Sequence, residues 1–128
     1  MNIVIVDDER DVKALFEQRF RREVRQGLLE LHFAFSGEEA LALLSHGGIA
    51  DIVLILSDIN MPGMNGLELL KIVKERYPQL KVYMITAYGD AESHQRAVEY
   101  GCDDYLTKPI DFKVLKSRMG LDADQGTA

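Results

Sequence analysis

Three carboxylates, one hydroxyl and one ammonium group follow the apolar segments of this chain that are predicted to be strands. Asp7 and Asp8 come directly after the first of these segments, Asp58 after the third, Thr86 after the fourth and Lys108 after the fifth. In an open parallel α/β sheet, ligands bind outside the carboxyl ends of the strands. We therefore expect these side chains to meet at one edge of the sheet and to form a site for a divalent cation and a phosphate group.

The predicted carboxylate cluster requires a compensating cation. Each close pair of carboxylates repels by on the order of several kcal/mol at an effective dielectric constant near 20. Oxygen ligands without histidine or cysteine favour a hard ion, so Mg²⁺ is the expected cofactor and Mn²⁺ the second candidate. With Lys108 and Thr86 at the same rim, such a site stabilises charge on a transferring phosphoryl group, and aspartate carboxylates act as nucleophiles toward phosphorus.

The composition narrows the class of protein. The chain has 128 residues, 47% of them hydrophobic, which suits one globular domain. A net charge of −6 argues against a nucleic-acid or anionic membrane surface, and the single cysteine, Cys102, excludes a disulfide framework. His32, His46 and His94 share no metal-binding spacing and are expected at the surface or at an edge of the sheet. There is neither a signal-peptide pattern nor an apolar run of about 20 residues, so a cytoplasmic location is expected.

The apolar pattern alternates between strand and helix five times. Strands are expected at residues 3–6, 29–33, 52–56, 82–85 and 105–106, and helices at 12–24, 36–46, 67–77, 91–100 and 111–119. This order predicts an α/β fold, a doubly wound (βα)5 sandwich around a five-stranded parallel sheet of order 2-1-3-4-5. The first and third strands are then neighbours, which places Asp7, Asp8 and Asp58 side by side.

Local signals mark the ends of several of these elements. The first helix is predicted to be continuous and to stop at Gly27, with inward-facing residues at Val12, Leu15, Phe16, Phe20 and Val24. Ser36 and Glu39 form a capping-box pattern, and Gly101 is predicted to be a helix C-cap. Residues 1–119 are expected to form one domain, and residues 120–128 a flexible tail or a linker stub.

Four segments of the chain resemble the receiver domain of two-component response regulators, of the chemotaxis-regulator-like kind. They are IVIVDDE at 3–9, LSDINMPGMNGLELL at 56–70, YMITAYGD at 83–90 and GCDDYLTKPID at 101–111. Each is moderately specific alone, and all four in order at strand ends are very specific. The resemblance covers about residues 1–119 and implies a flavodoxin-like fold.

The resemblance implies a phosphorylated signalling switch. Asp58 would be the phosphoacceptor and would take its phosphoryl group from a phosphohistidine on a sensor histidine kinase or a histidine phosphotransfer protein. Mg²⁺ would be held by Asp8 directly, by Asp7 mostly through water, by Asp58 and by the backbone carbonyl of Asn60. The protein would catalyse transfer to its own aspartate and hydrolysis from it, without an external metabolic substrate.

The same resemblance implies roles at the rim of the site. Lys108 would pair with Asp58 and then with the phosphoryl oxygens, and the Lys108–Pro109 bond would be cis. Thr86 would turn inward to hydrogen-bond a phosphoryl oxygen, and Tyr105 would turn inward with it. Two further positions, Asn60 and Tyr88, would tune the lifetime of the phosphoryl group, because a bulky Tyr88 hinders in-line attack by water.

Partners are expected on both sides of the switch. A kinase or phosphotransfer protein would act upstream, and an output domain or a downstream protein would receive the signal. No direct DNA binding by this domain and no membrane contact are expected. The last predicted helix is short, because Gly120 interrupts it, so a monomer or a weak phosphorylation-dependent dimer is expected.

Three other classes of protein share parts of this pattern. The main alternative is a Mg²⁺-dependent phosphohydrolase of doubly wound fold, but haloacid-dehalogenase-type enzymes carry Asp-x-Asp after the first strand, whereas Glu9 and Arg10 stand two residues after Asp7 and Asp8. A cap domain to exclude water is also missing. A flavodoxin-like cofactor binder needs a Ser/Thr/Gly-rich phosphate loop after the first strand. A DNA-binding regulator needs a helix-turn-helix module, and none fits within this length.

Overall fold

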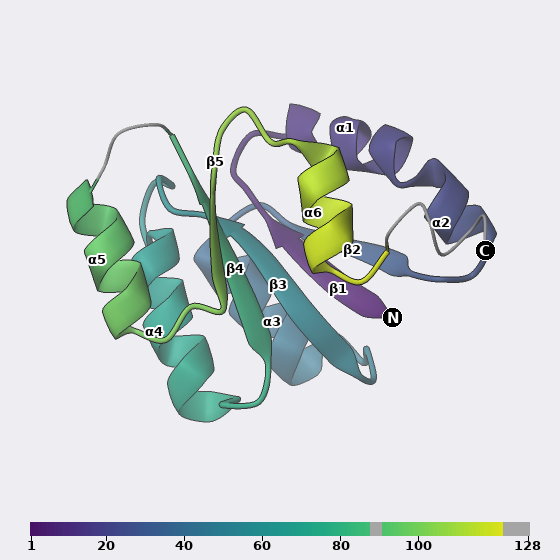
Figure 1. The fold of residues 1–128 in the computed structure, drawn as a ribbon. Helices are drawn as coiled ribbons and strands as arrows, with labels where there is room; N and C mark the ends of the chain where they lie inside the picture. Colours follow the sequence, from purple (N-terminus) through teal and green to yellow (C-terminus); the bar gives the residue numbers. More distant parts are fainter. Residues whose placement is uncertain (88–90, 122–128) are drawn as a thin grey trace.

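Five parallel strands form a single sheet in the order β2-β1-β3-β4-β5, as the sequence predicted. The computed structural model describes residues 1–87 and 91–121 (Figure 1). The strands are β1 Asn2–Val6, β2 Glu30–Ala34, β3 Ile52–Asp58, β4 Lys81–Thr86 and β5 Asp104–Thr107. Residues 88–90 and 122–128 are not described, so the predicted tail lies mostly outside the described residues.

Helices cover both faces of the sheet (Figure 1). They are α1 Asp11–Arg19, α2 Arg21–Arg25, α3 Gly37–His46, α4 Gly66–Arg76, α5 Ala91–Glu99 and α6 Phe112–Arg118. The first two and the last lie on one face, and α3, α4 and α5 lie on the other. No helix in the described part of the chain is long and apolar enough to cross a membrane.

The central strands are buried on both faces because helices cover each side. Val4 and Val6 point into the core beneath α3, α4 and α5, whereas Ile3 and Ile5 point into the core beneath α1 and α6. Side chains alternate between the two faces of a strand, so a strand covered on both sides must be apolar throughout. This burial fixes the register of β1 against β3, and therefore the positions of the carboxylates at their ends.

The prediction of one continuous first helix is wrong. The backbone leaves helical geometry at Phe20, with φ −106° and ψ 14°, and a short second helix follows. Phe20 is fully buried between Phe16 and Phe112. The break changes which residues face inward after it, so Glu23 is buried and Val24, which was expected inside, is 42% exposed. Leu15, before the break, was also expected inside and is 37% exposed.

The buried Glu23 is compensated from the other end of the chain. One of its carboxylate oxygens lies 3.0 Å from the Nζ atom of Lys116 in α6. The other oxygen, Oε1, has no hydrogen-bond partner within residues 1–87 and 91–121. The ion pair therefore holds α2 against α6, on the face of the sheet that also carries α1.

The predicted helix ends are confirmed in part. Ser36 accepts a hydrogen bond from the Glu39 N–H at 3.0 Å, but the Glu39 carboxylate accepts from Phe35 rather than from Ser36, so only half of the expected capping box is formed. A complete capping box precedes α4, with Asn65 and Glu68 bonded in both directions. Gly101 ends the helix before β5 in the left-handed region, with φ +90°.

Candidate functional site

Two adjacent strands bring the carboxylates together at the carboxyl edge of the sheet. Asp7 follows β1 directly, and Asp58 is the last residue of β3. Val6 is paired in register with Ser57, so the strands end side by side. Asp7, Asp8 and Asp58 each offer one oxygen atom, and these three atoms lie within 4.8 Å of one another. Asp7 and Asp58 are buried, and Asp8 is the more exposed member of the cluster.

Lys108 extends from the end of β5 into this cluster. Its Nζ atom lies 3.1 Å from Oδ2 of Asp58 and 3.7 Å from Oδ2 of Asp7. Its backbone N–H donates to the carbonyl of Thr86 at 2.7 Å, which ties the segment after β5 to the end of β4. The Lys108–Pro109 peptide bond is cis.

Burial and the charges in the cluster together perturb two pKa values. Burial is the largest effect on Asp7 and raises the pKa of that carboxyl group, and the negative charge of Asp58 raises it further; the Glu9 N–H and Lys108 act in the opposite direction. For Lys108, burial opposes the charged form, but the hydrogen bond to Asp58 and the charges of Asp58 and Asp7 outweigh it and raise the pKa. One ammonium group therefore does not neutralise the cluster.

The donor set of the cluster fits a hard divalent cation. All three groups are carboxylates, with neither histidine nor cysteine among them. Mg²⁺ binds oxygen ligands and is typically held by one or two carboxylates together with water and phosphate oxygens. Burial, followed by the charge of Asp58, raises the pKa of Asp7, and a cation bound at the cluster would favour the ionised form of this carboxyl group.

The loop after Asp58 holds the second oxygen of this carboxylate. The Asn60 N–H donates to Oδ1 of Asp58 at 3.3 Å, while Oδ2 faces Lys108. The Ile59 N–H donates to the carbonyl of Ile85 at 3.0 Å, which continues the contact between β3 and β4. Both carboxylate oxygens of Asp58 are therefore held in place by the backbone and by one side chain.

Gly66 is a site residue that the sequence analysis missed. A β-carbon at this position would lie 2.1 Å from the carbonyl oxygen of Asp58, and its own N–H donates to the Ile59 carbonyl at 2.8 Å. No side chain fits there without moving the backbone that carries Asp58. The sequence signalled only a turn, because the close approach depends on how α4 packs against the end of β3.

Thr86 ends β4 as a buried residue whose hydroxyl group is unsatisfied. It is 1% exposed, and Oγ1 has no hydrogen-bond partner within the described ranges 1–87 and 91–121. A buried hydroxyl group without a partner costs about 1–3 kcal/mol. Such an atom is available to bond a ligand that arrives at the same edge of the sheet.

Tyr105 lies in β5, next to the strand that carries Thr86. It is paired in register with Met84, two residues before Thr86. Its side chain is half-buried and packs against the core beneath α4 and α5, and its hydroxyl oxygen is buried. Its ring stacks on that of His94 in α5, with centroids 4.1 Å apart and an interplanar angle of 15°. His94 was expected only as a surface or edge residue, and Tyr88 lies outside the described residues.

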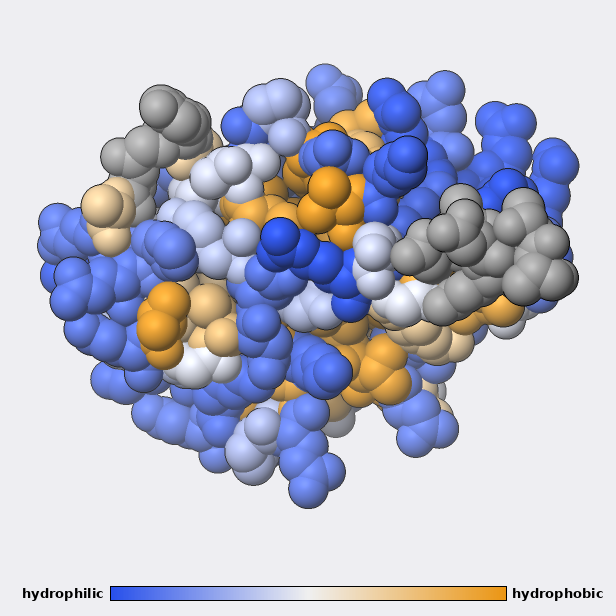
Figure 2. Space-filling view, viewed as in Figure 1, coloured by the Kyte–Doolittle hydropathy of each residue, from blue (hydrophilic) through white to orange (hydrophobic). Residues whose placement is uncertain are grey.

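An apolar groove runs beside Asp58. It has a volume of about 580 Å³ and lies between α1 and the segment that leads from β5 into α6. Its apolar walls include Val12, Leu15, Ile110 and Phe112, and Asp58 is among its polar residues. Figure 2 shows apolar surface where α6 begins, next to α1, within a largely hydrophilic surround.

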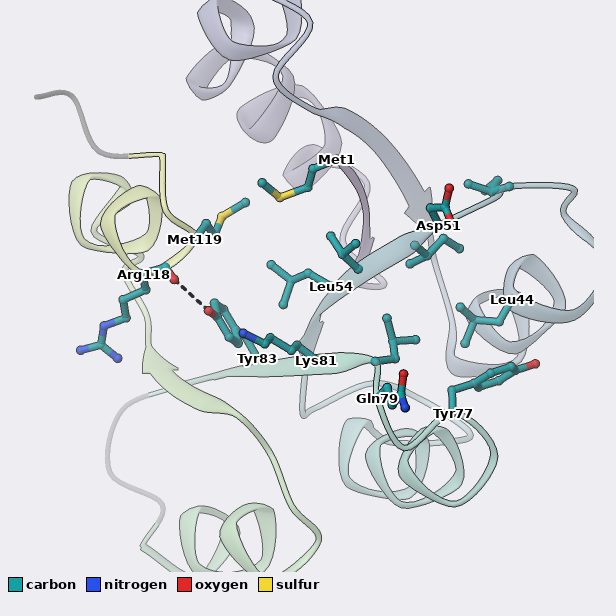
Figure 3. A pocket seen from close by; sticks show the side chains of 14 residues that line it. Met1, Leu44, Asp51, Leu54, Tyr77, Gln79, Lys81, Tyr83, Arg118 and Met119 are labelled. Atoms are coloured by element: carbon teal, nitrogen blue, oxygen red, sulfur yellow. Dashed lines mark hydrogen bonds between the residues drawn. The ribbon is translucent and has the colours of Figure 1, made fainter. Parts of the chain in front are cut away.

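A second cavity, of about 610 Å³, lies at the opposite, amino end of the strands (Figure 3). Met1, Leu54 and Met119 point into it, and the Tyr83 hydroxyl at its edge donates to the Arg118 carbonyl at 3.0 Å. None of the predicted site residues lines it. The slightly larger of these two cavities therefore lies away from the predicted site residues.

Comparison with known proteins points to one family. Residues 3–120 match the response regulator receiver domain. The chain is 40% identical over 111 residues to the DNA-binding transcriptional regulator NtrC of Proteus hauseri, a match that covers 87% of this chain and 22% of NtrC. The chain spans about a fifth of the length of the curated relatives it matches.

Solved structures with the same fold include two with clear sequence similarity. A CheY-like receiver domain protein from Methanospirillum hungatei is 29% identical, with a TM-score of 0.80, and the match covers 99% of this chain and 98% of that one. The response regulator TrrA of Thermotoga maritima, in complex with Mg²⁺-BeF, is also 29% identical, with a TM-score of 0.75 and coverage of 93% and 96%.

Proposed function

The chain belongs to the response regulator receiver domain family of two-component signal transduction, and from this premise we propose that it is a switch turned on by a phosphoryl group on Asp58. The observation that carries the proposal is the position of Asp58, which lies within reach of the Lys108 ammonium and inside a cluster of three carboxylates. Residues 1–119 would form the switching unit.

Asp58 would act as the nucleophile. One of its carboxylate oxygens attacks the phosphorus of a phosphohistidine, the P–O bond forms, and the P–N bond to the imidazole breaks. Asp7, Asp8, Asp58 and the backbone carbonyl of Asn60 would hold Mg²⁺, which supplies positive charge to the phosphoryl oxygens when it is bound. Lys108 would move from its ion pair with Asp58 to a phosphoryl oxygen and contribute a second positive charge.

Thr86 and Tyr105 would relay the change. The Thr86 hydroxyl group, buried and unsatisfied in the described structure, would donate to a phosphoryl oxygen. Tyr105 would follow, because its strand is paired with the strand that ends at Thr86. Two conformers that differ by only a few kcal/mol are enough for one new set of contacts to shift the population.

The upstream partner would be a sensor histidine kinase or a histidine phosphotransfer protein. A phosphohistidine that approaches Asp58 passes the apolar groove between α1 and α6, which offers contact area for apolar side chains of such a partner. Downstream, an output domain or a separate protein would receive the signal. The curated relative NtrC is named a DNA-binding transcriptional regulator and is several times longer than this chain.

The lifetime of the phosphoryl group would depend on Asn60 and Tyr88. Asn60 stands two residues after the acceptor Asp58, and Tyr88 stands two residues after Thr86. A bulky Tyr88 side chain would hinder the in-line attack of water and lengthen the lifetime. Tyr88→Ala should then speed dephosphorylation, and an unchanged decay rate would remove this part of the proposal.

Beryllofluoride, a stable mimic of a phosphoryl group, provides the test of switching. We expect it to bind in the presence of Mg²⁺ and to shift the NMR signals of Thr86 and Tyr105. The shifts should be absent without Mg²⁺ and in Asp58→Asn. Binding that leaves Thr86 and Tyr105 unmoved would contradict the relay, and a failure of the wild-type protein to bind would contradict the proposed function.

A further inference from the structure

A ring stack connects α5 to the sheet at the position of the proposed relay. The imidazole of His94 lies nearly parallel to the Tyr105 ring, at 15°, with centroids 4.1 Å apart. Ala97, one turn later in the same helix, is fully buried in the core, so the helix is anchored beside the stack. Exposed His94 thus covers a half-buried ring that belongs to another element.

This contact depends on one position of the Tyr105 side chain. The Tyr105 hydroxyl oxygen is buried in the structure, and the ring packs against the core beneath α4 and α5. Rotation about the first side-chain torsion would swing the ring by many ångströms and would break a stack with centroids at 4.1 Å. A contact made in only one of two conformers favours that conformer.

We infer that His94 is a positioning residue for the switch, because it holds Tyr105 in the position with the buried hydroxyl group. The inference rests on the proposed function, in which an inward Tyr105 accompanies the inward movement of Thr86. His94 then acts through Tyr105 and stabilises the conformer that binds a phosphoryl group. By linkage, any ligand of Asp58 that prefers an inward Tyr105 binds more tightly with His94 present.

The stack also lies between two elements next to Thr86. α5 is the next helix after Thr86 in the chain. Tyr105 belongs to β5, which is hydrogen-bonded to the strand that carries Thr86. The ring contact therefore joins the helix that follows Thr86 to the strand beside it.

The test compares four proteins: wild type, His94→Ala, His94→Phe and Gln95→Ala. Phenylalanine preserves a flat ring for stacking. Gln95 is the matched control, because it is exposed in the same helix and hydrogen-bonds Glu99 within that helix at 3.4 Å. Two quantities are measured: the rotamer populations of Tyr105, from NMR three-bond couplings without ligand, and the Kd of beryllofluoride with Mg²⁺.

We expect Tyr105 to occupy one rotamer in the wild type, in His94→Phe and in Gln95→Ala, and to average between rotamers in His94→Ala. The Kd of beryllofluoride should rise by about two- to tenfold in His94→Ala only, the range expected for one aromatic pair. In a Tyr105→Ala background, His94→Ala should change the Kd no further, because the contact is already lost.

Two results would overturn the inference. One is a single Tyr105 rotamer and an unchanged Kd in His94→Ala. The other is a change in Kd that persists in the Tyr105→Ala background, because His94 would then act by a route other than this ring. If the wild-type protein binds no beryllofluoride, the proposed function fails, and the rotamer populations alone decide whether His94 positions Tyr105.

Discussion

Lys108 and Asp58 are 50 residues apart in the sequence and form the ion pair at the centre of the site, with Nζ and Oδ2 separated by 3.1 Å. Within residues 1–87 and 91–121, Lys108 is also the only cation that forms an ion pair with Asp7. One flexible side chain thus compensates two buried carboxylates. Such a side chain can stay with the acceptor before phosphorylation and with the phosphoryl group after it.

Lys108→Ala should make the metal-free protein less stable and more responsive to Mg²⁺. Loss of the ammonium leaves Asp7 and Asp58 uncompensated, and we expect a loss of about 1 kcal/mol because the pair is partly exposed to solvent. The measurement is Tm with EDTA and with Mg²⁺. Mg²⁺ should raise the Tm of Lys108→Ala more than that of the wild type or of the exposed-site control Lys113→Ala, and equal increases would contradict this account of the site.

Asp7→Asn should stabilise the metal-free protein at neutral pH, by about 1 kcal/mol. The pKa of Asp7 is raised above its ordinary value of 3.8 in the folded protein, so the native state binds this proton more tightly than the unfolded state does. The ionised carboxylate therefore costs stability above the folded pKa, and this cost disappears as the pH falls toward 3.8.

The pH dependence of unfolding by urea, in EDTA, checks this sign. The advantage of Asp7→Asn should be largest near neutral pH and should shrink as the solution is acidified. In the wild type, Mg²⁺ affinity should fall over the same pH range, because protonated Asp7 no longer offers a charged oxygen. An advantage that is constant with pH would show that ionisation of Asp7 is not its cause.

Thr86→Val should separate stability from switching. Valine has nearly the shape of threonine but lacks the hydroxyl group that is buried and unsatisfied within the described ranges. We expect the variant to be more stable by about 1 kcal/mol without ligand and to lose the beryllofluoride-induced shift of Tyr105. A less stable variant that keeps this shift would mean that the hydroxyl group stabilises the unliganded protein and takes no part in switching.

Gly66→Ala should disturb the acceptor loop, whereas Gly37→Ala should not. Both glycines are the first residue of a helix, but a β-carbon at Gly66 meets the backbone of Asp58 at 2.1 Å, and one at Gly37 meets the flexible end of Met64 at 2.7 Å. We expect Gly66→Ala to lose more than about 2 kcal/mol in urea unfolding and Gly37→Ala to lose less than about 1 kcal/mol. Equal losses would refute the role of this close approach.

The carboxylate cluster could be predicted because it depends on topology. Apolar runs such as Ile3–Val6 indicate buried parallel strands, and the strand order then brings Asp7 and Asp58 to neighbouring positions. This inference needs only the ends of strands and no side-chain packing. Lys108 followed from the same rule, because it comes just after the fifth strand.

The missed features all depend on packing between distant elements. The burial of Glu23 requires the break at Phe20 and a lysine in the last helix, and neither follows from helical periodicity. The stack of His94 on Tyr105 joins a helix to a strand, so no spacing of residues in the sequence predicts it. From the sequence, Gly66 is an ordinary turn residue, and only the structure shows that the carbonyl of Asp58 lies next to it.

Phosphoryl transfer to Asp58 is the central claim, and intact-mass spectrometry after incubation with Mg²⁺ and acetyl phosphate tests it most directly. Asp51→Asn is the matched control, since Asp51 precedes the other end of β3 and its left-handed backbone, with φ 56°, accepts asparagine. We predict addition of one phosphoryl group to the wild type and to Asp51→Asn, and none to Asp58→Asn. Phosphoryl addition that persists in Asp58→Asn would contradict the account. The absence of phosphoryl addition to a folded wild-type protein that binds Mg²⁺ would contradict it as well.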